Sequence, residues 1–138
     1  MPDTFRMPGE GFGAAKTIHA IVNGQPIIRE TAAHTSLLDF LRDALDLKGA
    51  KECCAVGECG ACTIIVDGVP VNSCLMLAIE AEGKTIETVE GLSQGGQLST
   101  VQHSFLKCGG VQCGFCIPGM VMSAEALHRD APEADEAE

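Results

Sequence analysis

Residues 54–74, CAVGECGACTIIVDGVPVNSC, join a segment rich in cysteine and glycine to a strand-turn-strand pattern. The first part has no apolar periodicity, so a hydrophobic core does not organise its backbone. The second part begins with the β-branched run 63–66 and continues through Asp67-Gly68, a strong signal for a hairpin turn. Residues 69–72 supply the returning strand. We therefore expect a loop organised by a bound group, followed by a β-hairpin.

Four cysteines of this stretch have the spacing of iron–sulfur ligands. Cys54, Cys59 and Cys62 follow the pattern C-x4-C-x2-C, and Cys74 lies beyond the hairpin. This is the spacing of plant-type ferredoxins, in which four thiolates bind a 2Fe–2S cluster. Zinc is one alternative, but structural zinc sites favour paired C-x2-C units. Disulfides or inert thiols are another, and disulfides do not persist in a reducing compartment.

The residues around these cysteines suit the same interpretation. Gly57 and Gly60 can adopt positive φ, which lets backbone N–H groups turn toward the sulfur atoms and spread the negative charge of a cluster. Lys48 and Lys51 add positive charge nearby. Cys53 adjoins the first ligand but does not give the four-residue gap, so we expect it to be a buried thiol.

The N-terminal part predicts a second hairpin. Residues 1–15 are rich in Gly and Pro and indicate a flexible arm. The alternating residues 17–22 predict a strand, Asn23-Gly24 predicts a turn, and 25–29 predict the returning strand.

A helix is predicted after this hairpin. Thr35 or Ser36 can cap its N-terminus, and Gly49 is placed to end it. Its apolar residues recur at helical spacing: Leu37, Leu38, Phe40, Leu41, Ala44 and Leu45.

The polar, glycine-rich segment 91–96 divides the chain into two halves. Residues 85–89 before it predict a strand, whereas 98–107 and 120–127 after it predict helices, the second with Pro118 near its start. We therefore predict an α+β fold, with domains at 16–92 and 97–138.

A second cysteine loop, CGGVQCGFCIPG at 108–119, separates the two predicted helices. Cys113 and Cys116 form a C-x2-C pair, but a thioredoxin-like site would need a βαβ context that is lacking here. A zinc or iron–sulfur site would need two further ligands, and Cys108 is the one cysteine within reach. The four histidines occur singly and are expected to have ordinary surface roles.

The amino-acid composition and charge argue against several kinds of binding partner. Nine basic residues against nineteen acidic ones give a net charge of −10, which disfavours nucleic acid and anionic membrane surfaces as partners. No window of the sequence is apolar enough to span a membrane, and the N-terminus lacks a signal-peptide pattern. A cytoplasmic protein is expected.

Three segments together closely resemble the small iron–sulfur subunit of the molybdenum hydroxylase family, the relatives of xanthine dehydrogenase and aldehyde oxidoreductase. They are residues 54–74, TIETVEGL at 85–92 and VQCGFCIPGMVMSA at 111–124. The resemblance implies an N-terminal β-grasp, ferredoxin-like domain and a C-terminal helical domain, each with one 2Fe–2S cluster. It implies Cys54, Cys59, Cys62 and Cys74 as ligands of one cluster, and Cys113 and Cys116 as the first two ligands of the other.

The sequence departs from this family at its C-terminal end. The family completes the second cluster with a later C-x-C pair, but no cysteine follows Cys116 here. The segment APEADEAE, 131–138, resembles the first turn of a helix, so we expect a C-terminally shortened chain with a partial helical domain. A natural variant without a normal second cluster is the alternative.

The resemblance also implies a role in a hetero-oligomeric oxidoreductase. A large partner subunit would carry molybdopterin and oxidise the substrate, and a partner subunit would usually carry FAD. This chain would pass electrons from the molybdenum centre toward that flavin or another acceptor, with no catalytic residue of its own. Gln112 would lie beside the molybdopterin. A free-standing soluble 2Fe–2S ferredoxin is the alternative function, and a zinc-binding interaction module is a third possibility.

Overall fold

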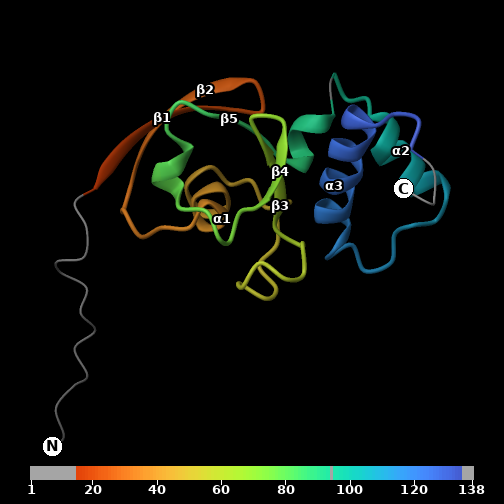
Figure 1. Ribbon diagram of the computed structural model, residues 1–138, viewed down its shortest axis with the longest axis horizontal. Helices are drawn as coiled ribbons and strands as arrows, with labels where there is room; N and C mark the ends of the chain where they lie inside the picture. The colour runs from red at the N-terminus through yellow and green to blue at the C-terminus, as the bar shows by residue number, and fades with distance from the viewer. Residues whose placement is uncertain (1–14, 94, 135–138) are drawn as a thin grey trace, which may run out of the picture.

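The computed structural model describes residues 15–93 and 95–134. Within these residues five strands form one mixed sheet in the order β2-β1-β5-β3-β4 (Figure 1). The strands are β1 (Lys16–Val22), β2 (Gln25–Thr31), β3 (Thr63–Val66), β4 (Val69–Asn72) and β5 (Thr85–Glu87). The α+β class predicted from the sequence is confirmed.

Both predicted hairpins are present. Asn23 and Gly24 have φ values of 50° and 77°, and Asp67 and Gly68 have 49° and 84°. Two successive residues with positive φ make a turn whose twist matches that of the flanking strands. These turns fix the antiparallel registers of β1 with β2 and of β3 with β4.

Strand β5 joins the two hairpins into one sheet. It pairs in parallel with β1, where Ile21 lies opposite Thr85, and antiparallel with β3, where Val66 lies opposite Ile86. The strand predicted at 85–89 ends at Glu87, because the chain turns into the 3-10 helix η3 (Val89–Leu92).

A short helix covers one face of the sheet. It consists of α1 (Leu37–Asp39) and the π-helical turn η1 (Phe40–Ala44), and the Ser36 side chain caps it by accepting a hydrogen bond from the Asp39 N–H at 3.0 Å. The predicted end at Gly49 is wrong. The helix stops after Ala44 because Asp46 adopts a φ of 56°, and the Leu47 N–H then donates to the Leu41 carbonyl.

The C-terminal helices confirm the predicted helical segments. The N-terminal one, α2 (Thr100–Lys107), has a capping box in which Ser99 and Gln102 bond each other's backbone N–H groups at 3.2 and 3.0 Å. The second, α3 (Ile117–Asp130), begins three residues before the predicted range and has Pro118 in its first turn. A further 3-10 helix, η2 (Ala78–Ala81), precedes β5.

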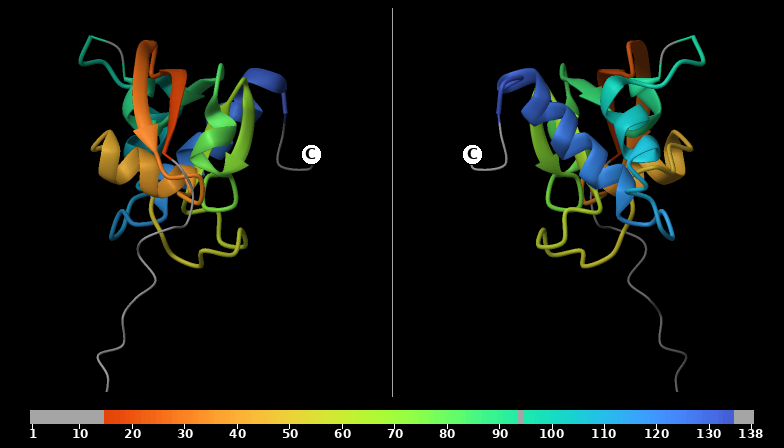
Figure 2. Two further views of the ribbon diagram at one scale, coloured as in Figure 1. Left: turned by 90° about the vertical axis from the view of Figure 1, so that its left-hand side faces the viewer. Right: turned by 90° about the vertical axis from the view of Figure 1, so that its right-hand side faces the viewer.

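Strand β3 is buried on both faces, because α3 covers the face that α1 does not. Ile64 and Val66 belong to the core beneath α1 and η1. Ile65 points the other way and packs with Val121 and Met122 of α3. The right-hand view of Figure 2 shows α3 beside the β3–β4 hairpin, and α3 contacts both strands. The sheet and the helical part therefore share an apolar interface, while the domain boundary at 91–96 remains a prediction.

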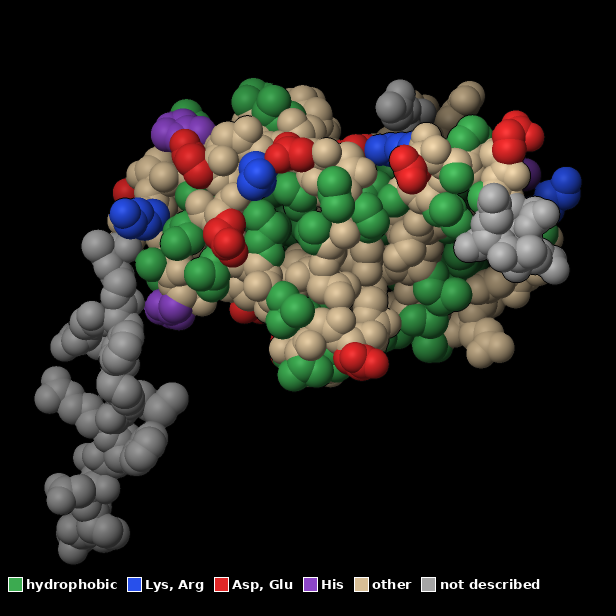
Figure 3. All heavy atoms as spheres, in the orientation of Figure 1, with side chains coloured by type: hydrophobic (Ala, Val, Ile, Leu, Met, Phe, Trp, Pro, Cys, Tyr) green, Lys and Arg blue, Asp and Glu red, His purple; other side chains and the backbone are tan. Residues whose placement is uncertain are grey.

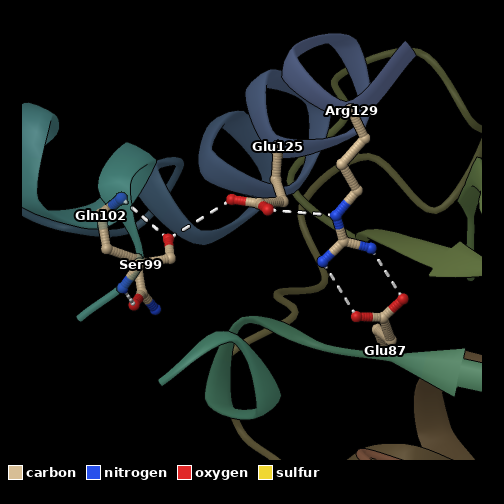
Figure 4. Close-up of polar contacts among 5 residues, drawn as sticks. All are labelled: Glu87, Ser99, Gln102, Glu125 and Arg129. Atoms are coloured by element: carbon tan, nitrogen blue, oxygen red, sulfur yellow. Dashed lines mark hydrogen bonds and ion pairs between the residues drawn. The ribbon is translucent and has the colours of Figure 1, made fainter. Parts of the chain in front are cut away.

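Polar contacts fix the C-terminal half of α3 to the sheet (Figure 4). The Arg129 guanidinium donates to both carboxylate oxygens of Glu87 on β5, at 2.8 and 3.0 Å. It also donates to Glu125 one turn earlier, at 3.1 Å. The Ser99 hydroxyl donates to the other Glu125 oxygen at 3.3 Å, so that α2, α3 and β5 are tied together.

The surface carries interspersed charges and many uncharged side chains. On the face shown in Figure 3, most charged side chains lie toward the upper edge, and the centre is largely uncharged. Over the described ranges, no helix has the length and apolarity that a membrane crossing requires. Of the predicted arm, residues 1–15, only Ala15 lies within the described part, and residues 135–138 of the tail lie outside it.

Candidate metal centre

The first cysteine loop projects from the sheet just before β3 and is the yellow segment at the lower edge of Figure 1. Its backbone reverses at Ala55, Gly57 and Gly60, which have φ values of 53°, 77° and 70°. The two glycines adopt this left-handed region as expected, whereas Ala55 does so without the benefit of a missing side chain. These reversals fold the loop back on itself.

The folded loop turns backbone N–H groups toward the Cys54 sulfur. The Cys59 N–H donates to the Cys54 Sγ at 3.4 Å. Hydrogen bonds from the N–H groups of Val56 and Cys59 lower the pKa of Cys54 from 9.0 to about 6, and the N–H of Glu58 contributes as well. A thiol with this pKa is largely thiolate at neutral pH, and the thiolate is the form that binds metal.

The β3–β4 hairpin brings Cys74 to the loop. Ser73 lies opposite the end of the loop, where its N–H and hydroxyl both donate to the Cys62 carbonyl, at 3.3 and 2.7 Å. Cys62 is 2% exposed and Cys74 is partly buried. Burial raises the pKa of Cys74, and a hydrogen bond with the Cys62 thiol raises it further.

The four predicted ligands are therefore gathered at one place. The Cys59 N–H donates to the Cys54 sulfur, and the Cys62 carbonyl accepts hydrogen bonds from Ser73, the residue before Cys74. The Cys54 sulfur also lies close enough to raise the pKa of Cys74. Among the described residues, no three His, Cys, Asp or Glu side chains converge on a single-ion position. In a 2Fe–2S cluster each iron takes two protein ligands, so four cysteines are the number that one such cluster requires.

Side chains next to the cysteines hold the loop against the hairpin. The Asn72 amide donates to the Gly57 carbonyl at 2.7 Å, and the Thr63 hydroxyl donates to the Gly60 carbonyl at 2.7 Å. Sequence reasoning missed both residues, although each adjoins a predicted ligand or its neighbour. On the other side, Lys51 donates to the carbonyls of Lys48 and Gly49, so this lysine organises the entry to the loop as well as adding charge.

The prediction that Cys53 is a buried thiol is wrong. Cys53 is exposed because the loop lies outside the sheet, where no apolar core covers it. A hydrogen bond with the Cys59 thiol raises the pKa of Cys53. Cys53 thus borders the site and is held as a thiol rather than a thiolate.

The second cysteine loop exposes its cysteines to solvent. Cys108 caps the C-terminus of α2, and Cys116 is the N-cap of α3. Cys108, Cys113 and Cys116 are all exposed, as is Gln112. The backbone reverses at Gly114, which has a φ of 85°. Both cysteine loops lie at the same end of the molecule, the lower end in Figures 1 and 2.

His19 has the ordinary surface role expected of it, and the same expectation for His34, His103 and His128 remains a prediction. His19 on β1 lies 3.2 Å from the Glu82 carboxylate in an exposed pair, and its backbone N–H donates to the same carboxylate at 2.7 Å. These contacts lower the pKa of Glu82, with the backbone hydrogen bond as the main cause. This pair joins β1 to the turn that precedes β5, where the Gly83 N–H donates to the His19 carbonyl at 2.7 Å.

Comparisons with known proteins agree with this geometry. A family model described as a 2Fe-2S iron-sulfur cluster binding domain matches residues 20–93, and one described as a [2Fe-2S] binding domain matches residues 88–138. The chain is 49% identical over 111 residues to the xanthine dehydrogenase iron-sulfur-binding subunit of Escherichia coli O157:H7, covering 80% of this chain and 69% of that one. It is 44% identical over 122 residues to the nicotinate dehydrogenase small FeS subunit of Eubacterium barkeri, covering 88% and 78%.

A solved structure shows the same fold. Quinoline 2-oxidoreductase from Pseudomonas putida 86 contains a chain that superposes with a TM-score of 0.85 at 44% identity, over 88% of this chain and 75% of that one. The site and fold define a 2Fe–2S protein with a ferredoxin-like sheet and a helical part. The chain belongs to the family of iron–sulfur subunits of molybdenum hydroxylases, and its relatives are subunits of oxidoreductase complexes.

Proposed function

We propose that Cys54, Cys59, Cys62 and Cys74 bind one 2Fe–2S cluster, and that the chain uses it to transfer electrons within a molybdenum hydroxylase complex. The observation that carries this proposal is the meeting of a tight loop and a hairpin end around these thiols. When bound, the cluster supplies one-electron redox chemistry, with a potential set by hydrogen bonds to sulfur and by solvent exposure.

The chain's own residues prepare this site in two ways. The N–H groups that point at Cys54 favour its thiolate and would spread negative charge away from the sulfur. The burial of Cys62, together with the hydrogen bonds from Ser73 and Asn72, fixes the loop and keeps water from its inner side. No residue of the site is needed as a general base or nucleophile.

Cys113 and Cys116 are proposed as the first two ligands of a second cluster. They are exposed on a loop at the same end of the molecule, and the matching [2Fe-2S] binding domain includes them. A 2Fe–2S cluster needs four ligands, and Cys108 is the one other cysteine near this pair in the sequence, so the pair alone does not complete a cluster. The chain on its own is therefore expected to hold about two iron atoms, those of the first cluster.

The proposed partners are a large molybdopterin subunit and a FAD subunit, in a cytoplasmic complex. The relatives named as subunits of xanthine and nicotinate dehydrogenases support a multi-subunit assembly. Large apolar side chains near both cysteine loops support it as well, because Val56, Leu75 and Phe115 are 70%, 64% and 44% exposed. Exposed apolar side chains that gather beside a functional site are typical of protein interfaces. Gln112 is proposed to face the molybdopterin.

Iron and acid-labile sulfide in the purified chain test the cluster assignment. Cys74→Ser should lose most of the iron and the visible charge-transfer bands, whereas the matched control Cys108→Ser should keep both. A colourless protein containing zinc would refute the proposal. Copurification with a molybdenum-containing subunit then separates a subunit of a complex from a free-standing ferredoxin.

A further inference from the structure

Gly119, in the first turn of α3, lies directly against the first cysteine loop. It is buried, and a Cβ atom at this position would lie 2.2 Å from the Gly60 carbonyl oxygen. The same Cβ would lie 3.1 Å from the Ala61 Cα and from the Gly60 carbonyl carbon. All three atoms belong to the backbone, so no side-chain rotation can relieve the overlap.

This contact joins the two cysteine loops by a short path. Gly60 lies between the proposed ligands Cys59 and Cys62, and Gly119 follows the proposed ligand Cys116 by three residues. In Figures 1 and 2 the start of α3 and the first cysteine loop lie at the same end of the molecule.

The rest of α3 is anchored, so the contact cannot open by a simple tilt of the helix. Val121 and Met122 pack against Ile65 of β3, one turn along from Gly119. Arg129 then pairs with Glu87 at the C-terminal end of the helix. The helix is thus held to the sheet near both ends.

We infer that Gly119 is a positioning residue, whose lack of a side chain sets the distance between the two cysteine loops. This inference rests on the proposed function, because that distance matters only if both loops hold redox groups. If a second cluster is completed at Cys113 and Cys116, it would be oxidised by one electron and the cluster at Cys54, Cys59, Cys62 and Cys74 would be reduced by that electron. The step makes and breaks no bond.

The size of the perturbation in Gly119→Ala follows from the contact. A carbon atom meets a carbonyl oxygen at about 3.3 Å or more, against 2.2 Å here, so α3 and the loop must separate by about 1 Å. Met120→Ala is the matched control, because Met120 is the next residue and is 50% exposed.

A spin label measures the spacing without a second cluster. In the full chain, Ser replaces Cys53, Cys108 and Cys113, and a Gd(III) chelate, which the reductant does not reduce, is attached to Cys116. The Gd(III) ion speeds the relaxation of the reduced cluster in the first loop, an effect that falls steeply with distance. Gly119→Ala should lose part of this enhancement and Met120→Ala should not. Equal enhancement in Gly119→Ala and the parent protein would overturn the inference.

The iron content of each variant separates failure of this inference from failure of the proposed function. If Cys74→Ser keeps its iron, the proposed function fails whatever the spacing. If Gly119→Ala does not fold, Ile65→Ala replaces it, because this change loosens the packing of α3 on β3 without adding an atom at the contact. The relaxation enhancement by the Gd(III) label should fall in Ile65→Ala, and an unchanged value there would equally refute the inference.

Discussion

Ile65 offers a sharp test of how the sheet and α3 depend on each other. Its side chain is 1% exposed and packs with Val121 and Met122 of α3. Its neighbour Ile64 is 0% exposed and belongs to the core on the opposite face of β3. The two residues therefore have the same chemistry, strand and burial but different partners, and each serves as the control for the other.

Ile65→Ala is expected to lower the free energy of unfolding by about 3 kcal/mol, within the range of about 2–5 kcal/mol for replacing a buried isoleucine by alanine. Ile65→Val should lower it by about 1 kcal/mol. Urea unfolding followed by circular dichroism measures these values. Amide hydrogen exchange locates the effect. Ile65→Ala should reduce protection in α3 more than in β1 and β2, whereas Ile64→Ala should reduce it in β1 and η1.

Two results would contradict this reasoning. A change below about 0.5 kcal/mol for Ile65→Ala would mean that the interface between β3 and α3 is not formed in solution, because a change that small is typical of exposed sites. Unchanged exchange protection in α3 would mean that the helix is stabilised by other contacts, such as that of Arg129 with Glu87.

The remaining predictions concern pH, the spare cysteines and the second loop. The Thr85 N–H and Lys84 lower the pKa of Asp67, so its contribution to stability is present above the ordinary value of 3.8 and is lost as pH falls through the folded-state pKa. Asp67→Asn should therefore have a lower melting temperature at pH 7 than the unmodified chain. Its melting temperature should also fall less on acidification below pH 3.8. Equal falls in the two proteins would contradict the role of the contacts of Asp67 with Thr85 and Lys84. The double variant Cys53→Ser, Cys108→Ser should keep its iron, and a loss of about half would make one of them a ligand. In an intact complex with a complete second cluster, Gln112→Ala should slow the reduction of that cluster by substrate and leave the iron content unchanged. A reduction rate equal to that of the unmodified complex would mean that Gln112 does not couple the two centres.

Local signals in the sequence predicted most of the sheet. Asn23-Gly24 and Asp67-Gly68 specify their turns because both residues of each pair adopt positive φ, a preference that depends on two neighbouring residues alone. The Ser36 cap of α1 is local in the same sense.

Features that depend on distant contacts were not predictable in this way. The helix after Ser36 stops at Ala44 because Asp46 turns the chain, although the apolar spacing continues to Leu45. The burial of Ile65 depends on α3, which lies more than fifty residues later in the sequence. The apolar pattern within β3 does not indicate that α3 covers Ile65.

In the candidate site, too, the local features were predictable from the sequence and those that depend on distant contacts were not. The spacing of Cys54, Cys59 and Cys62 predicted one loop, and the structure gathers these residues with Cys74. The exposure of Cys53 and the contact of Gly119 with Gly60 follow from how the loop lies against the rest of the fold. The spacing of the cysteines in the sequence predicts neither the exposure of Cys53 nor the contact of Gly119 with Gly60.

The central claim is that Cys54, Cys59, Cys62 and Cys74 hold one 2Fe–2S cluster. Electron paramagnetic resonance of the dithionite-reduced Cys59→Ser chain tests it most directly, with Cys108→Ser as the control. The account predicts that the signal of the reduced cluster is lost or strongly shifted in Cys59→Ser and is unchanged in Cys108→Ser. A Cys59→Ser spectrum identical to that of the unmodified chain would contradict the assignment.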